Sequence, residues 1–204
     1  MSFPANPVAT GEATKVSQWD TLFNATKDIY DSLRSTNELP VLAAALRPHA
    51  SGGCGALEDI LLSAGHYVQG LPFDPTSIES ASLAIPIPKR WNEGTITAQF
   101  FWLNTAGGSG AVVWQLAGVA AGDDETLDVA VGTFQTATDT VLAAKRNAVS
   151  AQTGAITIAG TPVASDLTRL VVQRDPTAGG DTYASDAYLI GVVLRLTTAE
   201  PNDA

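Results

Sequence analysis

The spacing of large apolar side chains changes about a third of the way along the chain. Between residues 16 and 33 these side chains recur at steps of three and four, the spacing of a helix with one apolar stripe. From about residue 67 to residue 197 they alternate with polar side chains in short runs that Gly, Pro, Asn and Asp interrupt. The pattern predicts an N-terminal helix followed by an all-β body. That organisation is typical of a structural or binding protein more often than of an enzyme.

The predicted helix follows an extended arm of residues 1–14 and ends near residue 35. Ser17 and Asp20 loosely match a capping box at its start. Steps of three and four are the spacing of a coiled-coil seam, but three heptads are marginal without help from neighbours. The helix therefore either packs on its own domain or associates with other copies, and both alternatives stay open. The predicted seam comprises Val16, Trp19, Leu22, Phe23, Ile29, Tyr30 and Leu33.

Residues 36–65 are predicted to be a connector. It holds a short apolar run over 39–46, a glycine-rich break over 51–55, and a second short helix over 56–64 that Gly65 stops. The resulting division is an anchoring and oligomerising part, residues 1–65, and a displayed domain, residues 66–204.

The β body contains several clear alternating runs. Ile96, Ala98, Phe100 and Trp102 share one strand face, and the side chains of Tyr188, Ile190, Val192, Leu194 and Leu196 are predicted to share one face of a long last strand. About eight strands with turns every 8 to 15 residues predict a mainly β fold, a β-sandwich of the jelly-roll type.

Charge and composition limit the classes of partner that the protein is expected to bind. The net charge is −10, and the eleven Lys and Arg residues are scattered, which disfavours nucleic acid and anionic membrane surfaces as partners. The sequence has no run of about 18 apolar residues, so it predicts no membrane-spanning helix. The N-terminus lacks a basic and apolar leader, so we expect synthesis in a cytoplasm. Cys54 is the sole cysteine, which excludes an internal disulfide.

The sequence predicts no catalytic motif. The segment 107–111, Gly-Gly-Ser-Gly-Ala, resembles a nucleophile elbow, but a strand-like run follows it and both histidines, His49 and His66, precede it. No lysine follows a glycine as a phosphate-binding loop requires. We therefore expect no catalytic residue and no cofactor.

Two segments remain as weaker candidates. Asp123, Asp124 and Asp128 form the one acidic cluster and are a weak candidate for a calcium loop, with a solvated loop as the favoured alternative. Trp91, beside Lys89 and Arg90, is a candidate for stacking on a sugar ring, with core or inter-subunit packing as the alternative.

Two stretches resemble tailed-phage fibre and decoration proteins. The first is residues 8–20, VATGEATKVSQWD, followed by Asn24 and residues 28–33. The second carries short motifs of a virion jelly roll: Leu71-Pro72-Phe73, Pro86, Gly94-Thr95-Ile96-Thr97, Trp102, Val113-Trp114, Gly132-Thr133, Ala159-Gly160-Thr161-Pro162, Arg174-Asp175 and Leu189-Ile190-Gly191-Val192. The resemblance implies a jelly-roll domain, a virion setting and a trimer, and it implies no catalytic residue.

The sequence thus predicts a bacteriophage virion structural protein. It would be a homotrimeric subunit of a tail fibre, head fibre or capsid decoration, assembled in the host cytoplasm and carried on the virion surface beside other capsid or tail proteins. A glycan-binding jelly roll used for host adsorption is the alternative. A glycan-degrading enzyme and a cellular lectin-like module also stay open.

Overall fold

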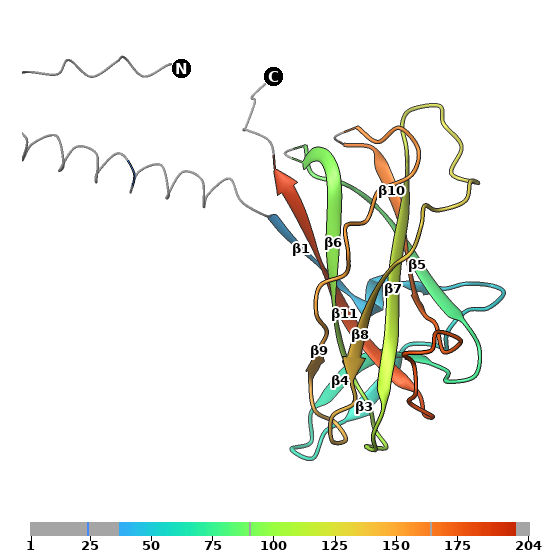
Figure 1. Ribbon diagram of the computed structural model, residues 1–204, viewed down its shortest axis with the longest axis vertical. Coiled ribbons are helices and arrows are strands. Elements are labelled where there is room, and N and C mark those ends of the chain that lie inside the picture. The colour runs from blue at the N-terminus through green and yellow to red at the C-terminus, as the bar shows by residue number, and fades with distance from the viewer. Residues whose placement is uncertain (1–23, 25–36, 90, 164, 199–204) are drawn as a thin grey trace, which may run out of the picture. The chain divides into compact units, whose positions relative to one another are not determined.

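The computed structural model describes residue 24 and residues 37–89, 91–163 and 165–198 (Figure 1). The chain forms two compact units, residues 1–35 and 36–204. In the first unit only Asn24 is described, and it is helical and exposed. The predicted seam from Val16 to Leu33 lies outside the described residues. All the described strands belong to the second unit.

The second unit is built from two antiparallel sheets. Sheet A has the strand order β3-β4-β11-β6-β9, and β1 also pairs with β11. Sheet B has the order β2-β5-β10-β7-β8. The strands are β1 (Asn37–Leu42), β2 (Arg47–Pro48), β3 (Glu58–Leu61), β4 (Tyr67–Phe73), β5 (Glu79–Pro86), β6 (Trp91–Leu103), β7 (Ala111–Ala121), β8 (Gln135–Thr140), β9 (Ala148–Val149), β10 (Leu167–Arg174) and β11 (Ala187–Thr198), with a 3-10 turn η1 (Ala43–Ala45).

The last eight strands have the connectivity of a jelly roll. The chain passes from sheet to sheet between β4 and β7, and β8 follows β7 in sheet B before β9, β10 and β11 alternate again. This gives two four-stranded layers, β4-β11-β6-β9 and β5-β10-β7-β8, the arrangement of two interleaved Greek keys. The predicted mainly β sandwich is thereby confirmed.

The core fills the space between the sheets. Trp102 of sheet A and Trp114 of sheet B are both fully buried, and their ring centroids are 6.1 Å apart. Phe73 and Phe100 pack on the same indole of Trp114, at 5.2 and 5.8 Å. Aromatic side chains at these separations contribute both buried apolar area and ring-to-ring attraction. Trp102 and Trp114 thus lie at the centre of the core.

The interval 36–65 was predicted to be a connector with a helix, and that prediction is wrong. β1 pairs with β11, β2 pairs with β5, and β3 pairs with β4, so the interval lies within the sheets. The segment 56–64 is half of a hairpin rather than a helix, because Glu58–Leu61 finds a cross-strand partner in Tyr67–Gly70. Gly65, with φ at +82°, closes the turn between them.

The last strand departs from a single alternation. The register of β11 against β6 shifts between Leu189 and Gly191, which is a β-bulge. Leu189 on one side of the bulge and Val192 on the other are both buried in the core, whereas Tyr188 and Ile190 are half-buried. The prediction that Tyr188 and Ile190 share a face with Val192 is therefore wrong.

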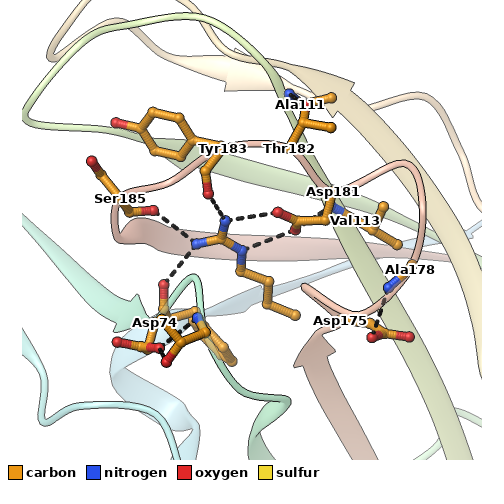
Figure 2. A network of polar contacts seen from close by, with 12 residues as sticks. Asp74, Ala111, Val113, Asp175, Ala178, Asp181, Thr182, Tyr183 and Ser185 are labelled. Carbon is orange, nitrogen blue, oxygen red and sulfur yellow. Dashed lines mark hydrogen bonds and ion pairs between the residues drawn. The ribbon is translucent and has the colours of Figure 1, made fainter.

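A buried arginine fixes the connection between β10 and β11. Arg174 is fully buried, and its Nε and Nη2 donate to both carboxylate oxygens of Asp181 at 3.0 and 2.8 Å (Figure 2). Nη2 also donates to the carbonyl oxygen of Tyr183, and Nη1 donates to those of Phe73 and Ser185. Every N–H of the guanidinium is thus used, so the loop 175–186 is held against the body of the sandwich.

Candidate functional site

A hollow of about 400 Å³ lies at one end of sheet B, where β7 ends. Its volume falls within the range of about 300–1,000 Å³ that is usual for small-molecule sites. Residues of the strand, of the acidic loop that follows it and of a second loop near residue 160 form its walls. The lining residues are Val119, Ala120, Glu125, Thr126, Val129, Ala130, Gly160 and Thr161.

Main-chain hydrogen bonds tie the loops on either side of the hollow to β7. The N–H of Ala120 donates to the carbonyl of Ala159 at 2.9 Å. The carbonyl of Gly118 accepts from Ala159 at 3.0 Å and from Gly132 at 3.1 Å. Both loops are therefore tied to the strand, so the floor does not depend on side-chain contacts alone.

Gly160 is required for the close approach of the second loop. Its φ is +86°, a conformation that side-chain-bearing residues rarely adopt. A Cβ atom at this position would lie 2.6 Å from the carbonyl oxygen of Ala120, which is backbone that cannot move aside. Only glycine lets the loop lie against the floor here.

The acidic loop presents one carboxylate and one hydroxyl to the hollow. A turn closes on Gly122, whose N–H donates to Glu125 Oε2 at 2.9 Å and whose carbonyl accepts from the Glu125 N–H at 3.3 Å. Thr126 Oγ1 accepts from the N–H of Asp128 at 3.1 Å. These local bonds orient Glu125 and Thr126, while Glu125 Oε1 and the hydroxyl proton of Thr126 can serve a ligand.

Arg169 borders the hollow from β10. Its cross-strand partner is Val119, and its Nη2 donates to the carbonyl oxygen of Val129, so both of these contacts are with lining residues. Its Nε is buried without a hydrogen-bond partner. The hollow thus combines an apolar floor with one carboxylate, two threonine hydroxyls and a neighbouring guanidinium.

The acidic residues that were the weak sequence candidate for a calcium loop do not line the hollow. Asp123, Asp124 and Asp128 lie in the loop but are not among the residues that line the hollow. Across the described part of the chain, no group of three or more His, Cys, Asp or Glu side chains comes together to hold a metal ion. The loop supplies Glu125 and Thr126 to the hollow instead.

Trp91 is not an exposed platform for a sugar. Its side chain is 2% exposed and belongs to the core cluster, and its indole N–H is buried without a hydrogen-bond partner. The alternative, packing in the core, describes its position.

No helix among the described residues is long and apolar enough to cross a membrane.

The outer face of sheet A carries a row of polar side chains. In this row Arg195 donates to Glu38 at 2.8 Å and to Gln99 at 3.1 Å. The half-buried Tyr188 lies elsewhere on this sheet. The pKa of its phenol is raised mainly by burial and, to a smaller extent, by the negative charge of Glu58. None of the residues that line the hollow belongs to a strand of sheet A.

No family model matches the sequence, and no curated protein matches it. Several solved structures align with the fold at low similarity. The CBM22-2 xylan-binding domain of Paenibacillus barcinonensis Xyn10C is 11% identical with a TM-score of 0.43, and the match covers 78% of this chain and 99% of that domain. The family 11 carbohydrate-binding module of Clostridium thermocellum is 8% identical with a TM-score of 0.39, covering 82% and 91%.

An isomalto-dextranase of Arthrobacter globiformis T6 is 15% identical with a TM-score of 0.42 over 79% of this chain. The chain spans only 23% of the length of that enzyme. At such TM-scores the fold assignment rests on the strand order of the two sheets, and what these proteins bind or cleave is a property of theirs alone.

Proposed function

We propose that this protein is a glycan-binding β-sandwich and that the hollow at the end of β7 is its recognition site. One observation carries the proposal: an acceptor carboxylate and two hydroxyls lie in a hollow lined otherwise by Val, Ala and Gly residues, and a guanidinium borders it. A sugar ring has the matching character, since its C–H groups are apolar and its hydroxyls both donate and accept hydrogen bonds. Pockets for small molecules generally combine an apolar lining with a few placed polar groups.

The charges around the hollow favour a neutral sugar over an anionic ligand. Glu125 lines the hollow, and the whole chain carries a net charge of −10. Arg169 offsets that charge locally and offers donors to sugar oxygens. A vicinal pair of hydroxyls could donate to Glu125 on one side and accept from Arg169 on the other.

We further propose that the site binds glycan without cleaving it. Glycoside hydrolysis uses two carboxyl groups, roughly 5–10 Å apart, that flank the scissile bond. Glu125 is the one carboxylate among the residues that line the hollow. The carboxylate of Asp166 approaches the same turn at Gly122 but is outside the lining, and its Oδ2 accepts from the Val163 N–H at 2.9 Å. One carboxylate can accept hydrogen bonds from a sugar but cannot act as both acid and nucleophile or base.

The test is isothermal titration of the full chain with glucose, galactose, mannose and N-acetylglucosamine. We expect at least one of them to bind, and Glu125→Gln to weaken it about tenfold or more, because a hydrogen bond to a charged group contributes roughly 1.5–3 kcal/mol. Asp123→Asn is the matched control, since it removes the same charge from the same loop outside the lining. No binding of any of the four sugars, or equal losses in both variants, would contradict the proposed site.

A second proposal concerns display and assembly. The steps of three and four between Val16 and Leu33 favour association of N-terminal segments from several copies. We propose that a homo-oligomer, a trimer by the phage resemblance, carries the sandwich on a virion surface together with capsid or tail proteins. Glycan binding would then serve adsorption to a host.

A further inference from the structure

We infer that the outer face of sheet A is an interface between copies of this chain. This inference rests on the assembly proposed above and adds a surface to it, and it does not depend on glycan binding. The surface concerned is called the assembly face. It consists of Pro40 and Leu42 of β1, Val193 of β11, Phe101 of β6 and Val149 of β9.

Strand alternation places these five side chains on one side of the sheet. Residues next to them in the same strands belong to the core between the sheets, namely Val41, Val192, Phe100 and Ala148. Successive side chains of a strand point to opposite faces. The side chains of the assembly face therefore point away from the core.

Cross-strand pairing brings the five side chains together in two neighbouring rows. The first row crosses four strands through the consecutive pairs Leu42–Gly191, Gly191–Phe101 and Phe101–Val149. In the next row Pro40 pairs with Val193. The assembly face is thus one apolar patch that extends from β1 to β9.

The assembly face is accessible. Leu42 is 66% exposed and Val149 is 41% exposed, Pro40 is exposed, and Phe101 and Val193 are half-buried. Single exposed apolar side chains are ordinary on a protein surface, but a contiguous apolar patch marks an interaction site. The face of a sheet is broad, so it suits the surface of another protein better than a small molecule.

The charges beside the assembly face do not oppose contact between copies. The chain carries a net charge of −10, and like charges on two copies repel. In the row beyond Pro40 and Val193, Glu38 is paired with Arg195, and Arg195 Nε donates to Glu38 Oε1 at 2.8 Å. These two charges offset each other, so a second copy meets little repulsion from this row.

The place of β1 in the chain favours a second copy as the occupant. The predicted seam ends at Leu33, and β1 begins at Asn37. Four residues of extended chain span at most about 14 Å. Copies that associate through the seam therefore hold the beginnings of their β1 strands near one another, and β1 carries Pro40 and Leu42.

Pro40 favours contact through the face over contact through the edge. Among the described strands β1 pairs with β11 alone, so its other edge is open there. Proline has no N–H to donate, and a proline within an edge strand interrupts any further ladder. A second copy therefore meets the side chains of the assembly face rather than extending the sheet.

The experiment follows the mass of the full chain by light scattering over a dilution series. We expect an oligomer that dissociates on dilution, and we expect Leu42→Asp and, separately, Val149→Asp to raise the concentration of half-dissociation about tenfold or more. The reason is that each substitution replaces a buried apolar contact with a carboxylate that has no partner in the interface. Leu61→Asp is the matched control, because Leu61 is 49% exposed on β3, outside the assembly face.

The outcomes separate the assembly face from the proposed seam. If Leu42→Asp and Val149→Asp dissociate no more readily than Leu61→Asp, the assembly face is overturned. If Trp19→Ala with Phe23→Ala then still lowers the mass, the seam stands without it. A parent chain that is monomeric at every concentration overturns both. The glycan proposal is tested separately, because the hollow and the assembly face share no residue.

Discussion

The buried guanidinium of Arg174 gives the sharpest stability prediction. Arg174→Met replaces a fully buried arginine with an uncharged side chain of similar length. The carboxylate of Asp181, whose side chain is 2% exposed, then has no cation to pair with. Removing one member of a buried ion pair costs about 3–5 kcal/mol. The carbonyl oxygens of Phe73, Tyr183 and Ser185 each lose a donor as well. Because these losses overlap, we expect about 5 kcal/mol in total rather than their sum.

The matched control is Arg195→Met. Arg195 also pairs with a carboxylate at 2.8 Å, but the side chains of Arg195 and Glu38 are 21% and 56% exposed. Exposed ion pairs contribute about 0–1 kcal/mol. The two substitutions therefore remove the same chemical group from a buried and an exposed pair of equal length.

The assay is urea denaturation of the full chain followed by tryptophan fluorescence, since Trp102 and Trp114 lie in the core. Adding Asp181→Asn to Arg174→Met should recover part of the loss, because it removes the unpaired charge. If Arg174→Met lowers the free energy of unfolding by no more than Arg195→Met does, the reasoning is refuted. A chain that fails to fold with Arg174→Met is tested through Arg174→Lys, which keeps the charge and should still lose roughly 2 kcal/mol or more as the two-pronged contact is lost.

Three further predictions concern other parts of the chain. Burial raises the pKa of Glu79 above its unfolded value of 4.5, so its contribution to stability is present below that value and is lost as pH rises through the folded pKa. Glu79→Gln, which keeps the acceptor for the Asp74 N–H, should therefore raise the melting temperature at pH 7 but not at pH 4; a lower melting temperature at pH 7 would contradict this. Burial also raises the pKa of Cys54 to about 12, so thiol labelling by DTNB at pH 8 should be slow in the folded chain and fast in denaturing urea, and equal rates would show the thiol to be accessible. Trp19→Ala with Phe23→Ala should reduce an oligomer to monomers in light scattering, and an unchanged mass, or a monomeric parent chain, would count against the predicted seam.

The sandwich could be predicted from sequence because its core strands alternate plainly. In Ile96, Ala98, Phe100 and Trp102 every second residue is apolar, and all four are buried in the structure. The interval 36–65 gave no such signal. β2 has two residues and β3 has four, of which one is buried, so their strand character comes from pairing with β5 and β4 rather than from local pattern.

The candidate site was predictable in part. The acidic loop stood out for its carboxylates, but the sequence favoured a solvated loop there, with a calcium site as the weak alternative. The residues that the loop contributes to the hollow are Glu125 and Thr126. Gly160 and Thr161 stood in the sequence only as part of the phage resemblance. Arg169 lies some 40 residues from the loop that it contacts, and only the antiparallel register of β10 and β7 brings it there. A bulge such as that at Leu189 likewise has no local signal, because it depends on the partner strand.

The central claim is that sheet B, and not sheet A, binds glycan, through the hollow at the end of β7. The most direct measurement is a crystal structure of the full chain with the tightest-binding sugar from the titration. The account predicts a sugar ring in the hollow, within hydrogen-bond distance of Glu125. An oligosaccharide seated on the outer face of sheet A beside Gln99 and Arg195 would contradict it.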